Sequence, residues 1–385
     1  MKRQQLNFMS PSPHSLRALQ VSTFVVLASC VALGSALIGK NGGSTDLTAS
    51  IADATSPSTP TASVEPPRER TPKVVSENTV LSSAVDQGRD SIRFFEKDTG
   101  KSFRADVSNL TTSIISADKI IGFQRGAWVP LAQGALIFAR EPSGVRVKYL
   151  RFSNRSTVTL DSSFVDAAVS PDGQRGAFIQ ENNNDSRTIL TAALDGSNPR
   201  EYLVTRASDM RLYWKSNDAL SFTSRRSNHA GYDLTIVDSA HTLRQLLTNK
   251  ENLELSWSPD GKRLLYSYFS PTDGVSLWIW DENTAMSAPL LVPTSAQKCT
   301  WTPQGDSIVC GIPAKNTLTR DIPADKTATI DNIEVIDPTT NARRRIYTGA
   351  PGRLFGVTKP LVTTSGEYFV FTNMFDARLY VVPLQ

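Results

Sequence analysis

The chain has 385 residues, a formal net charge of +4 and 20% charged residues, with basic and acidic side chains interspersed. A nucleic-acid surface would need basic residues gathered on one face, so we expect no nucleic-acid partner. Three histidines (His14, His229 and His241) and three cysteines show no zinc-ligand spacing, and we expect no metal and no cofactor.

The first predicted element is a membrane span over residues 18–39, ALQVSTFVVLASCVALGSALIG, which carries no charge and is bracketed by Arg17 and Lys40. As a helix it would extend about 33 Å, enough to cross a hydrocarbon core of roughly 30 Å. A cleaved signal peptide has a shorter apolar region, but the small residues at 34–36 leave cleavage as the alternative.

The charge flanking this span predicts its orientation. Lys2, Arg3 and Arg17 precede it without any acidic residue. The positive-inside rule therefore predicts a cytoplasmic tail over residues 1–17 and an extracytoplasmic location for everything after the span. We expect a single-pass protein of the cell membrane.

Residues 40–78 are dominated by Ser, Thr and Pro and have no apolar period of 2 or 3.6 residues. Such a segment cannot bury enough surface to offset its ordering entropy, so we interpret it as a disordered tether. The folded ectodomain is expected over residues 79–385.

The ectodomain repeats a short phrase, SWSPDGKRLLY at residues 256–266, with copies VSPDGQRGAFI from Val169 and WTPQGDSIVCG from Trp301. Its anchor positions are Pro130, Pro171, Pro259 and Pro303 and, in degenerate copies, Ser216 and Thr364. A period of about 40 to 45 residues is typical of propeller blades of four strands. An earlier copy from Val80 lacks the Pro, which makes seven units, with six as the alternative count.

Each part of the phrase has a physical reason. Asp172-Gly173 and Asp260-Gly261 are signals for a two-residue hairpin of type I′, since Gly accepts positive φ. The preceding Pro ends the innermost strand where no ladder donor is wanted. The third strand of several units closes on an Asp whose side chain can cap the turn backbone; these residues are Asp195, Asp238, Asp281 and Asp337.

Tryptophan occupies one position of the repeat, two residues before the anchor, as Trp128, Trp214, Trp257 and Trp301. An aromatic ligand platform is one interpretation. Because the indole recurs in several copies, we favour the interpretation that it packs between neighbouring blades. The repeated phrase would then have a structural role and not a ligand-binding one.

These residues resemble the TolB-type β-propeller repeat, W-S-P-D-G-K-x-[IL]-x-[FY], over roughly residues 80–385. The copy at residues 256–266 matches nearly throughout, whereas the copy at Trp301 has Gln304 for the Asp. The resemblance implies an all-β propeller fold. The repeat family is similar to TolB, a periplasmic partner of envelope proteins, and to the propeller halves of prolyl oligopeptidases. TolB's N-terminal domain has no counterpart here, so its partners are not carried over.

No motif of enzymatic chemistry stands in the chain. The Gly-x-Ser-x-Gly elbow of oligopeptidases, the sialidase box, the P-loop and the dinucleotide fingerprint are all missing. We expect a protein that is not an enzyme, with no catalytic residue to name.

Cys299 and Cys310 flank the turn at Gln304-Gly305 symmetrically and so face each other across a hairpin. A disulfide is plausible outside the cytoplasm, and two small core residues are the alternative. A two-residue loop would make this a hydrogen-bonded pair with Cα atoms about 5.5 Å apart. Cys30 lies inside the predicted span.

About 61 residues separate Pro303 from Thr364, so an insertion lies between the second and third strands of the sixth unit. It contains Arg320, Asp321, Asp325 and Lys326, and we name it the candidate binding loop because long loops in compact domains are often functional. A surface insertion packed on the blade is the alternative.

The leading hypothesis is a membrane-tethered propeller that binds an envelope or surface protein, or a glycan. The first alternative is an enzyme that processes surface polysaccharide or peptide in the propeller channel, which a ring of carboxylates and arginines at one channel mouth would favour. The second is a purely structural spacer in an envelope complex.

Overall fold

The computed structural model describes residues 70–130, 134–225, 230–315, 328–350 and 352–385. The predicted tail, membrane span and most of the tether lie outside these ranges. Within them, no helix has the length and apolar character needed to cross a membrane. The described residues form one compact unit that is all β apart from short turns.

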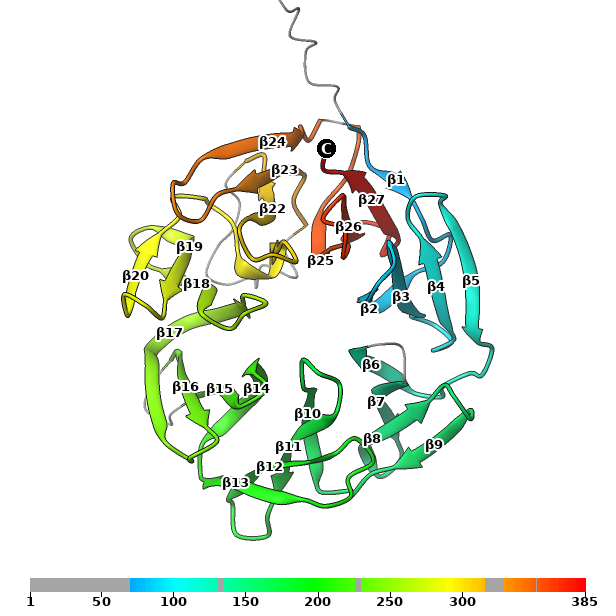
Figure 1. Cartoon of the computed structure of the whole chain (residues 1–385), viewed down its shortest axis with the longest axis vertical. Coiled ribbons are helices and arrows are strands. Elements are labelled where there is room, and N and C mark those ends of the chain that lie inside the picture. Colours follow the sequence, from blue (N-terminus) through cyan, green and yellow to red (C-terminus); the bar gives the residue numbers. More distant parts are fainter. Residues whose placement is uncertain (1–69, 131–133, 226–229, 316–327, 351) are drawn as a thin grey trace, which may run out of the picture. The chain divides into compact units, whose positions relative to one another are not determined.

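The strands form seven blades of four antiparallel strands each, arranged in a ring (Figure 1). This is the β-propeller that the repeat predicted, with seven blades in the described part of the chain.

The first three blades are separate sheets, each numbered from the innermost strand outward. Their strands are β2 (Val80–Asp86), β3 (Ser91–Glu96), β4 (Ser102–Asp106) and β5 (Thr111–Ser116); β6 (Phe123–Trp128), β7 (Gly134–Glu141), β8 (Gly144–Arg151) and β9 (Ser156–Thr159); and β10 (Phe164–Val169), β11 (Arg175–Glu181), β12 (Arg187–Ala193) and β13 (Arg200–Thr205).

The next two blades share one long strand, β17, which is the outer strand of the fourth blade and the inner strand of the fifth. Their strands are β14 (Ser208–Ser216), β15 (Ala219–Arg225), β16 (Tyr232–Asp238), β17 (Leu243–Trp257), β18 (Arg263–Ser270), β19 (Gly274–Asp281) and β20 (Met286–Pro289). β17 changes partner between Lys250 and Glu251, and its register in the fifth blade then shifts between Glu251 and Glu254.

The sixth blade contains β21 (Cys299–Trp301), β22 (Ile308–Pro313), β23 (Asp331–Ile336) and β24 (Arg343–Tyr347), preceded by the short 3-10 helix η2 (Ala296–Lys298). The seventh contains β25 (Val357–Val362), β26 (Tyr368–Asn373) and β27 (Leu379–Pro383). Its outer strand is β1 (Lys73–Val74), which pairs with β27, so the N-terminal end of the described chain closes the ring. The expected boundary at residue 79 falls after this strand.

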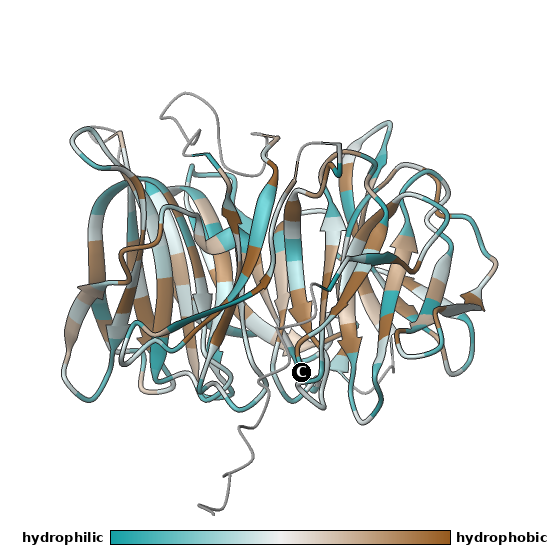
Figure 2. Ribbon diagram, turned by 90° about the horizontal axis from the view of Figure 1, so that it is seen from above, coloured by the Kyte–Doolittle hydropathy of each residue, from teal (hydrophilic) through white to brown (hydrophobic). Residues whose placement is uncertain are grey.

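The propeller has two faces. We call the face that carries the hairpins between first and second strands, such as residues 258–263, the turn face. We call the face where the innermost strands begin, for example at Phe123 and Val357, the entry face. In Figure 2 hydrophobic residues lie mainly along the strands and hydrophilic residues gather in the loops of both faces.

The hairpin turns are longer than the predicted type I′ turns. Gly261 N–H donates to the Ser258 carbonyl at 2.8 Å, and Ser258 N–H donates to the Arg263 carbonyl at 2.8 Å. Four residues therefore form the loop, with Pro and Asp inside a β-turn and Gly261 after it at a φ of 69°. Asp260 does not have the positive φ that type I′ would require, so the predicted turn type was wrong.

Side chains of the phrase satisfy the backbone of this loop. Ser258 Oγ donates to Asp260 at 2.6 Å and accepts from the Arg263 N–H at 2.9 Å. Ser170, Asp172 and Arg175 repeat the same pattern in the third blade. Partial burial alone would raise the pKa of Asp260, but the hydrogen bonds from Ser258 and the Lys262 N–H hold it below its ordinary value.

The aspartates at the ends of the third strands cap their turns, as predicted. Each accepts a hydrogen bond from the backbone N–H two residues further on, at 3.1 Å for Asp195, 3.0 Å for Asp238, 2.9 Å for Asp281 and 2.7 Å for Asp337.

Candidate functional site

A ring of charge surrounds the propeller axis near the entry face. Five residues before each anchor, the innermost strand or its flank carries a charged side chain in six of the seven blades: Arg125, Asp166, Arg211, Glu254, Lys298 and Lys359. In the second to fifth blades a β-bulge directly precedes this position. Bulges re-aim side chains, so this recurring irregularity sets the direction of the charged ring.

Members of the charged ring link neighbouring blades. Arg125 forms an ion pair with Asp166 of the next blade, and its guanidinium also lies over the Phe138 ring. Asp166 in turn accepts a hydrogen bond at 3.3 Å from the Leu212 N–H in the fourth blade. Part of the charged ring therefore stabilises the contacts between neighbouring blades.

Lys298 is the most deeply buried member, with 1% of its side chain exposed. Its Nζ donates to Asp331 at 2.5 Å and to Thr329 at 2.7 Å. Asp331 also accepts from Thr329 Oγ1 and, at 2.7 Å, from the Val357 N–H of the seventh blade. Burial lowers the pKa of Lys298, and the charges of Asp331 and Glu254 oppose that shift.

The solvent-exposed charges of the ring are positive. Arg125, Arg211 and Lys359 are exposed, whereas only 18% of the Asp166 side chain is exposed and Glu254 is half-buried. Because the acidic side chains of the ring are mostly buried and three of its basic side chains are exposed, the mouth of the channel presents positive charge to solvent.

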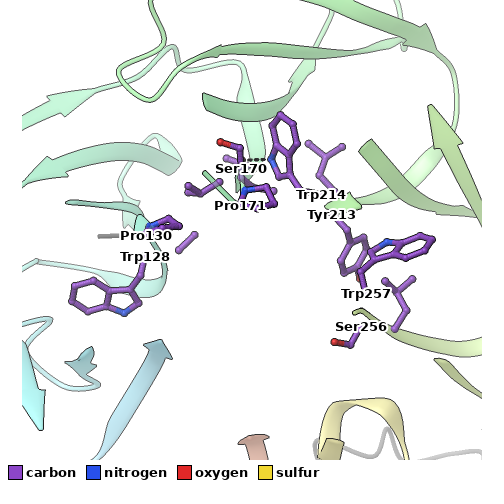
Figure 3. A pocket seen from close by; sticks show the side chains of 14 residues that line it. Trp128, Pro130, Ser170, Pro171, Tyr213, Trp214, Ser256 and Trp257 are labelled. Atoms are coloured by element: carbon purple, nitrogen blue, oxygen red, sulfur yellow. Dashed lines mark hydrogen bonds between the residues drawn. The ribbon is translucent and has the colours of Figure 1, made fainter. Parts of the chain in front are cut away.

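A pocket of about 490 Å³ is lined by the innermost strands of the second to fifth blades (Figure 3). Its lining includes Ala127, Ala168, Tyr213 and Ser256, which stand two residues after the ring position on their strands. Alternation places residues two apart on the same side of a strand, about 7 Å from each other. The pocket therefore lies directly beneath the charged ring.

Tyr213 joins the two features. Its neighbours in the repeat are small, so its ring occupies space that an Ala or Ser leaves open in the adjacent blades. Burial raises the pKa of the Tyr213 phenol; the positive charge of Arg211 opposes the shift and the negative charges of Asp166 and Glu254 add to it. The phenol is thus within electrostatic reach of three members of the ring.

Three of the repeated tryptophans, Trp128, Trp214 and Trp257, border this pocket, but all four are used between blades. The indole N–H donates to the preceding blade: Trp128 to the Ser82 carbonyl, Trp214 to the Ala168 carbonyl, Trp257 to Ser221 Oγ and Trp301 to the Ser256 carbonyl. A cation from the preceding blade lies over each indole: Arg93, Arg175, Lys215 and Arg263 respectively. Figure 3 marks the Trp214 bond beside Ser170.

The predicted disulfide between Cys299 and Cys310 is present, with Cα atoms 4.1 Å apart. This is shorter than expected because the four-residue loop reverses the hydrogen-bonding parity: Thr302 N–H donates to the Ser307 carbonyl, which leaves Cys299 and Cys310 as a non-hydrogen-bonded pair. The bridge directly follows Lys298 of the ring.

The four residues of the candidate binding loop, Arg320, Asp321, Asp325 and Lys326, lie outside the described residues. The described end of the insertion is Thr329 and Asp331, which bind Lys298. The insertion therefore returns to the sixth blade beside the charged ring and at the entry face.

The charged ring itself was missed from the sequence. Its signal was present, because aligning the copies on their anchors puts charges in one column. The column contains four basic and two acidic residues, so it does not stand out as a patch of one charge sign. Within the described ranges, no three His, Cys, Asp or Glu side chains gather as metal ligands.

No family model and no curated protein matches the chain by sequence. Solved structures do match it. An oligogalacturonate lyase in complex with manganese has a TM-score of 0.58 at 11% identity, covering 82% of this chain and 97% of its own; the lyase from Vibrio parahaemolyticus has 0.57 at 12%, covering 80% and 90%.

TolB from Acinetobacter baumannii also matches, at a TM-score of 0.45 and 14% identity, with 69% of this chain and 62% of TolB covered. At these identities the two lyase structures show the fold alone, which is that of this β-propeller. They leave the activity of this chain open.

Proposed function

We propose that this chain is a membrane-tethered, extracytoplasmic propeller that binds an acidic segment of an envelope or surface protein at its entry face. The observation that carries the proposal is the charged ring, whose exposed members Arg125, Arg211 and Lys359 are all cationic. A mouth whose exposed charges are positive attracts acidic ligands and raises their rate of encounter.

A protein partner is favoured over a glycan by the state of the tryptophans. An exposed indole face is a common platform on which a sugar ring stacks. Trp128 instead packs against Phe95 and Phe152 and beneath Arg93, and the other repeated indoles carry cations from the preceding blade. Their faces are engaged in holding blades together.

Cross-linking mass spectrometry on native membranes tests the proposal. We expect a specific partner whose cross-links fall at least tenfold in Arg211→Glu, because the substitution reverses an exposed charge of the mouth. Lys262→Glu is the matched control, since it also reverses an exposed positive charge, but on the turn face. Cross-links that survive Arg211→Glu, or that fall equally in both variants, would reject the entry-face site.

A chain lacking residues 314–327 tests the candidate binding loop in the same experiment. A partner lost with this deletion and with Arg211→Glu would place the loop and the mouth in one interface. A partner lost only with the deletion would move the interface to the loop.

The second candidate is an enzyme acting on an anionic polysaccharide, which the alternating carboxylates and arginines of the ring favour. The half-buried Tyr213 phenol, among Asp166, Arg211 and Glu254, is a group that can exchange a proton within the pocket. Lyases of this fold act on oligogalacturonate, as their names state. Shortening of polygalacturonate by the native chain but not by Tyr213→Phe would support this candidate and displace the binding proposal.

A further inference from the structure

The charged ring and the pocket beneath it form one composite surface. On four consecutive inner strands, a ring member is followed two residues later by a pocket residue: Arg125 by Ala127, Asp166 by Ala168, Arg211 by Tyr213 and Glu254 by Ser256. The strands are regular between these two positions, so the two levels stay about 7 Å apart around this part of the axis.

Most of the residues that line the pocket have apolar side chains. Besides Ala127 and Ala168, its walls include Val169, Leu212 and Leu255. Pro130 and Pro171 border it toward the turn face (Figure 3). A volume of about 490 Å³ lies within the usual range of ligand pockets, and it is large enough for a big apolar side chain.

We propose that the partner's acidic segment carries one large apolar side chain that enters this pocket, flanked on both sides by Asp or Glu. The apolar side chain fills the space between Ala127, Ala168 and Tyr213, and the flanking carboxylates lie on Arg125 and Arg211. This inference rests on the proposed function and adds the recognition pattern, acid–apolar–acid. Its basis is charge complementarity at the mouth combined with an open pocket, lined mainly by apolar residues, directly below.

Tyr213 sets the size of the chamber. Its ring stands where the neighbouring blades have Ala or Ser, so it takes up space that would otherwise extend the pocket. Removing the ring should let a larger side chain enter. A purely electrostatic surface would not change its preference for the size of the apolar residue in this way.

The test is selection of a seven-residue peptide library displayed on phage against the full chain in lipid nanodiscs. We expect a consensus with one Leu, Met or Phe and an Asp or Glu within two or three positions on each side. A synthetic consensus peptide should bind about tenfold or more weakly when its apolar residue becomes Ala, because burying such a side chain is worth about that much.

Two protein variants complete the design. Ala168→Leu enlarges a residue of the pocket wall without changing any charge and should weaken the consensus peptide at least tenfold. Ala127→Leu enlarges the wall from another blade, if the first variant folds poorly because Ala168 also packs against the core between blades. Tyr213→Ala should shift the selected apolar residue toward Phe and Trp.

The outcomes separate the two proposals. A consensus of acids without an apolar centre would overturn this inference and leave the proposed function standing. No consensus at all would overturn the inference, and cross-links insensitive to Arg211→Glu would overturn the proposed function as well. Binding unchanged in both pocket-filling variants would also reject the pocket as the site.

Discussion

Lys298 illustrates how a single residue connects several parts of the propeller. It precedes β21, receives its counter-charge from Asp331 at the start of β23, and is joined through that carboxylate to the backbone of β25. Three chain segments therefore meet at one ammonium group that has 1% exposure. A buried ion pair is tolerated only when its remaining hydrogen-bonding capacity is satisfied, and here Thr329 supplies a further bond.

Lys298→Met should destabilise the protein by about 3 to 5 kcal/mol, because it leaves the Asp331 carboxylate buried without its counter-charge. Urea unfolding at neutral pH measures the loss. The double variant Lys298→Met/Asp331→Asn should recover much of it, since no charge is then stranded. A double variant that is less stable than Lys298→Met would contradict this account.

At this scale the sequence predicted residues that act locally. The capping aspartates and the cysteine pair were found because their partners lie within a few residues or directly across one hairpin. The contact between Lys298 and Asp331 spans an insertion and could not be inferred from spacing. The sequence also contains the charged ring, as charged residues five positions before each anchor. Which of these side chains are exposed depends on the β-bulges that precede them, and the sequence does not show those bulges.

At the scale of elements, the Gly of the repeated phrase serves two purposes. Gly261 has a φ of 69°, and a Cβ on it would stand 2.2 Å from the Lys215 carbonyl of the preceding blade. The turns of adjacent blades thus approach so closely that only a hydrogen fits.

Gly261→Ala should be far more destabilising than Gly274→Ala. Gly274 has nearly the same φ, 70°, but nothing lies within 4 Å of the position of a Cβ, so its replacement costs about 1 to 2 kcal/mol for backbone strain alone. The Gly261 variant adds a backbone clash with Lys215. Thermal unfolding of the two variants side by side gives the comparison; equal melting temperatures would refute the role of close approach.

The strand layout was predictable because each blade repeats it, whereas the turn type was not. Asp-Gly suggested a two-residue loop, but the preceding Pro occupies the first central position of a β-turn and moves the Gly to its end. Ser258 and Asp260 then bond to each other and to the loop backbone, which makes four residues the better-satisfied loop.

For the whole molecule, the number of blades followed from the period, and the closure of the ring did not. β1 lies in the segment predicted to be tether, whose composition gives no strand signal. Its pairing with β27 is fixed by tertiary structure alone: Val75 N–H donates to the Leu379 carbonyl at 2.8 Å, and the Val75 side chain is buried against the first and last blades.

Val75→Pro should open this closure, because proline removes the N–H that bonds to Leu379 and also removes a buried side chain. We expect a lower melting temperature and faster proteolysis near residue 75. Val74→Ala is the control, since Val74 is exposed and its N–H is retained. Equal stability of the two variants would show that the ring closes without this segment.

The direction of β1 has a mechanical consequence. It runs antiparallel to β27, so the chain reaches the propeller at the turn face and passes to the entry face before β2 begins. If the preceding residues anchor the protein, any tension between anchor and captured partner is applied along a two-residue strand at the seam of the ring. The pairing of Lys73–Val74 with Tyr380–Val381 would then carry that tension along the strand direction.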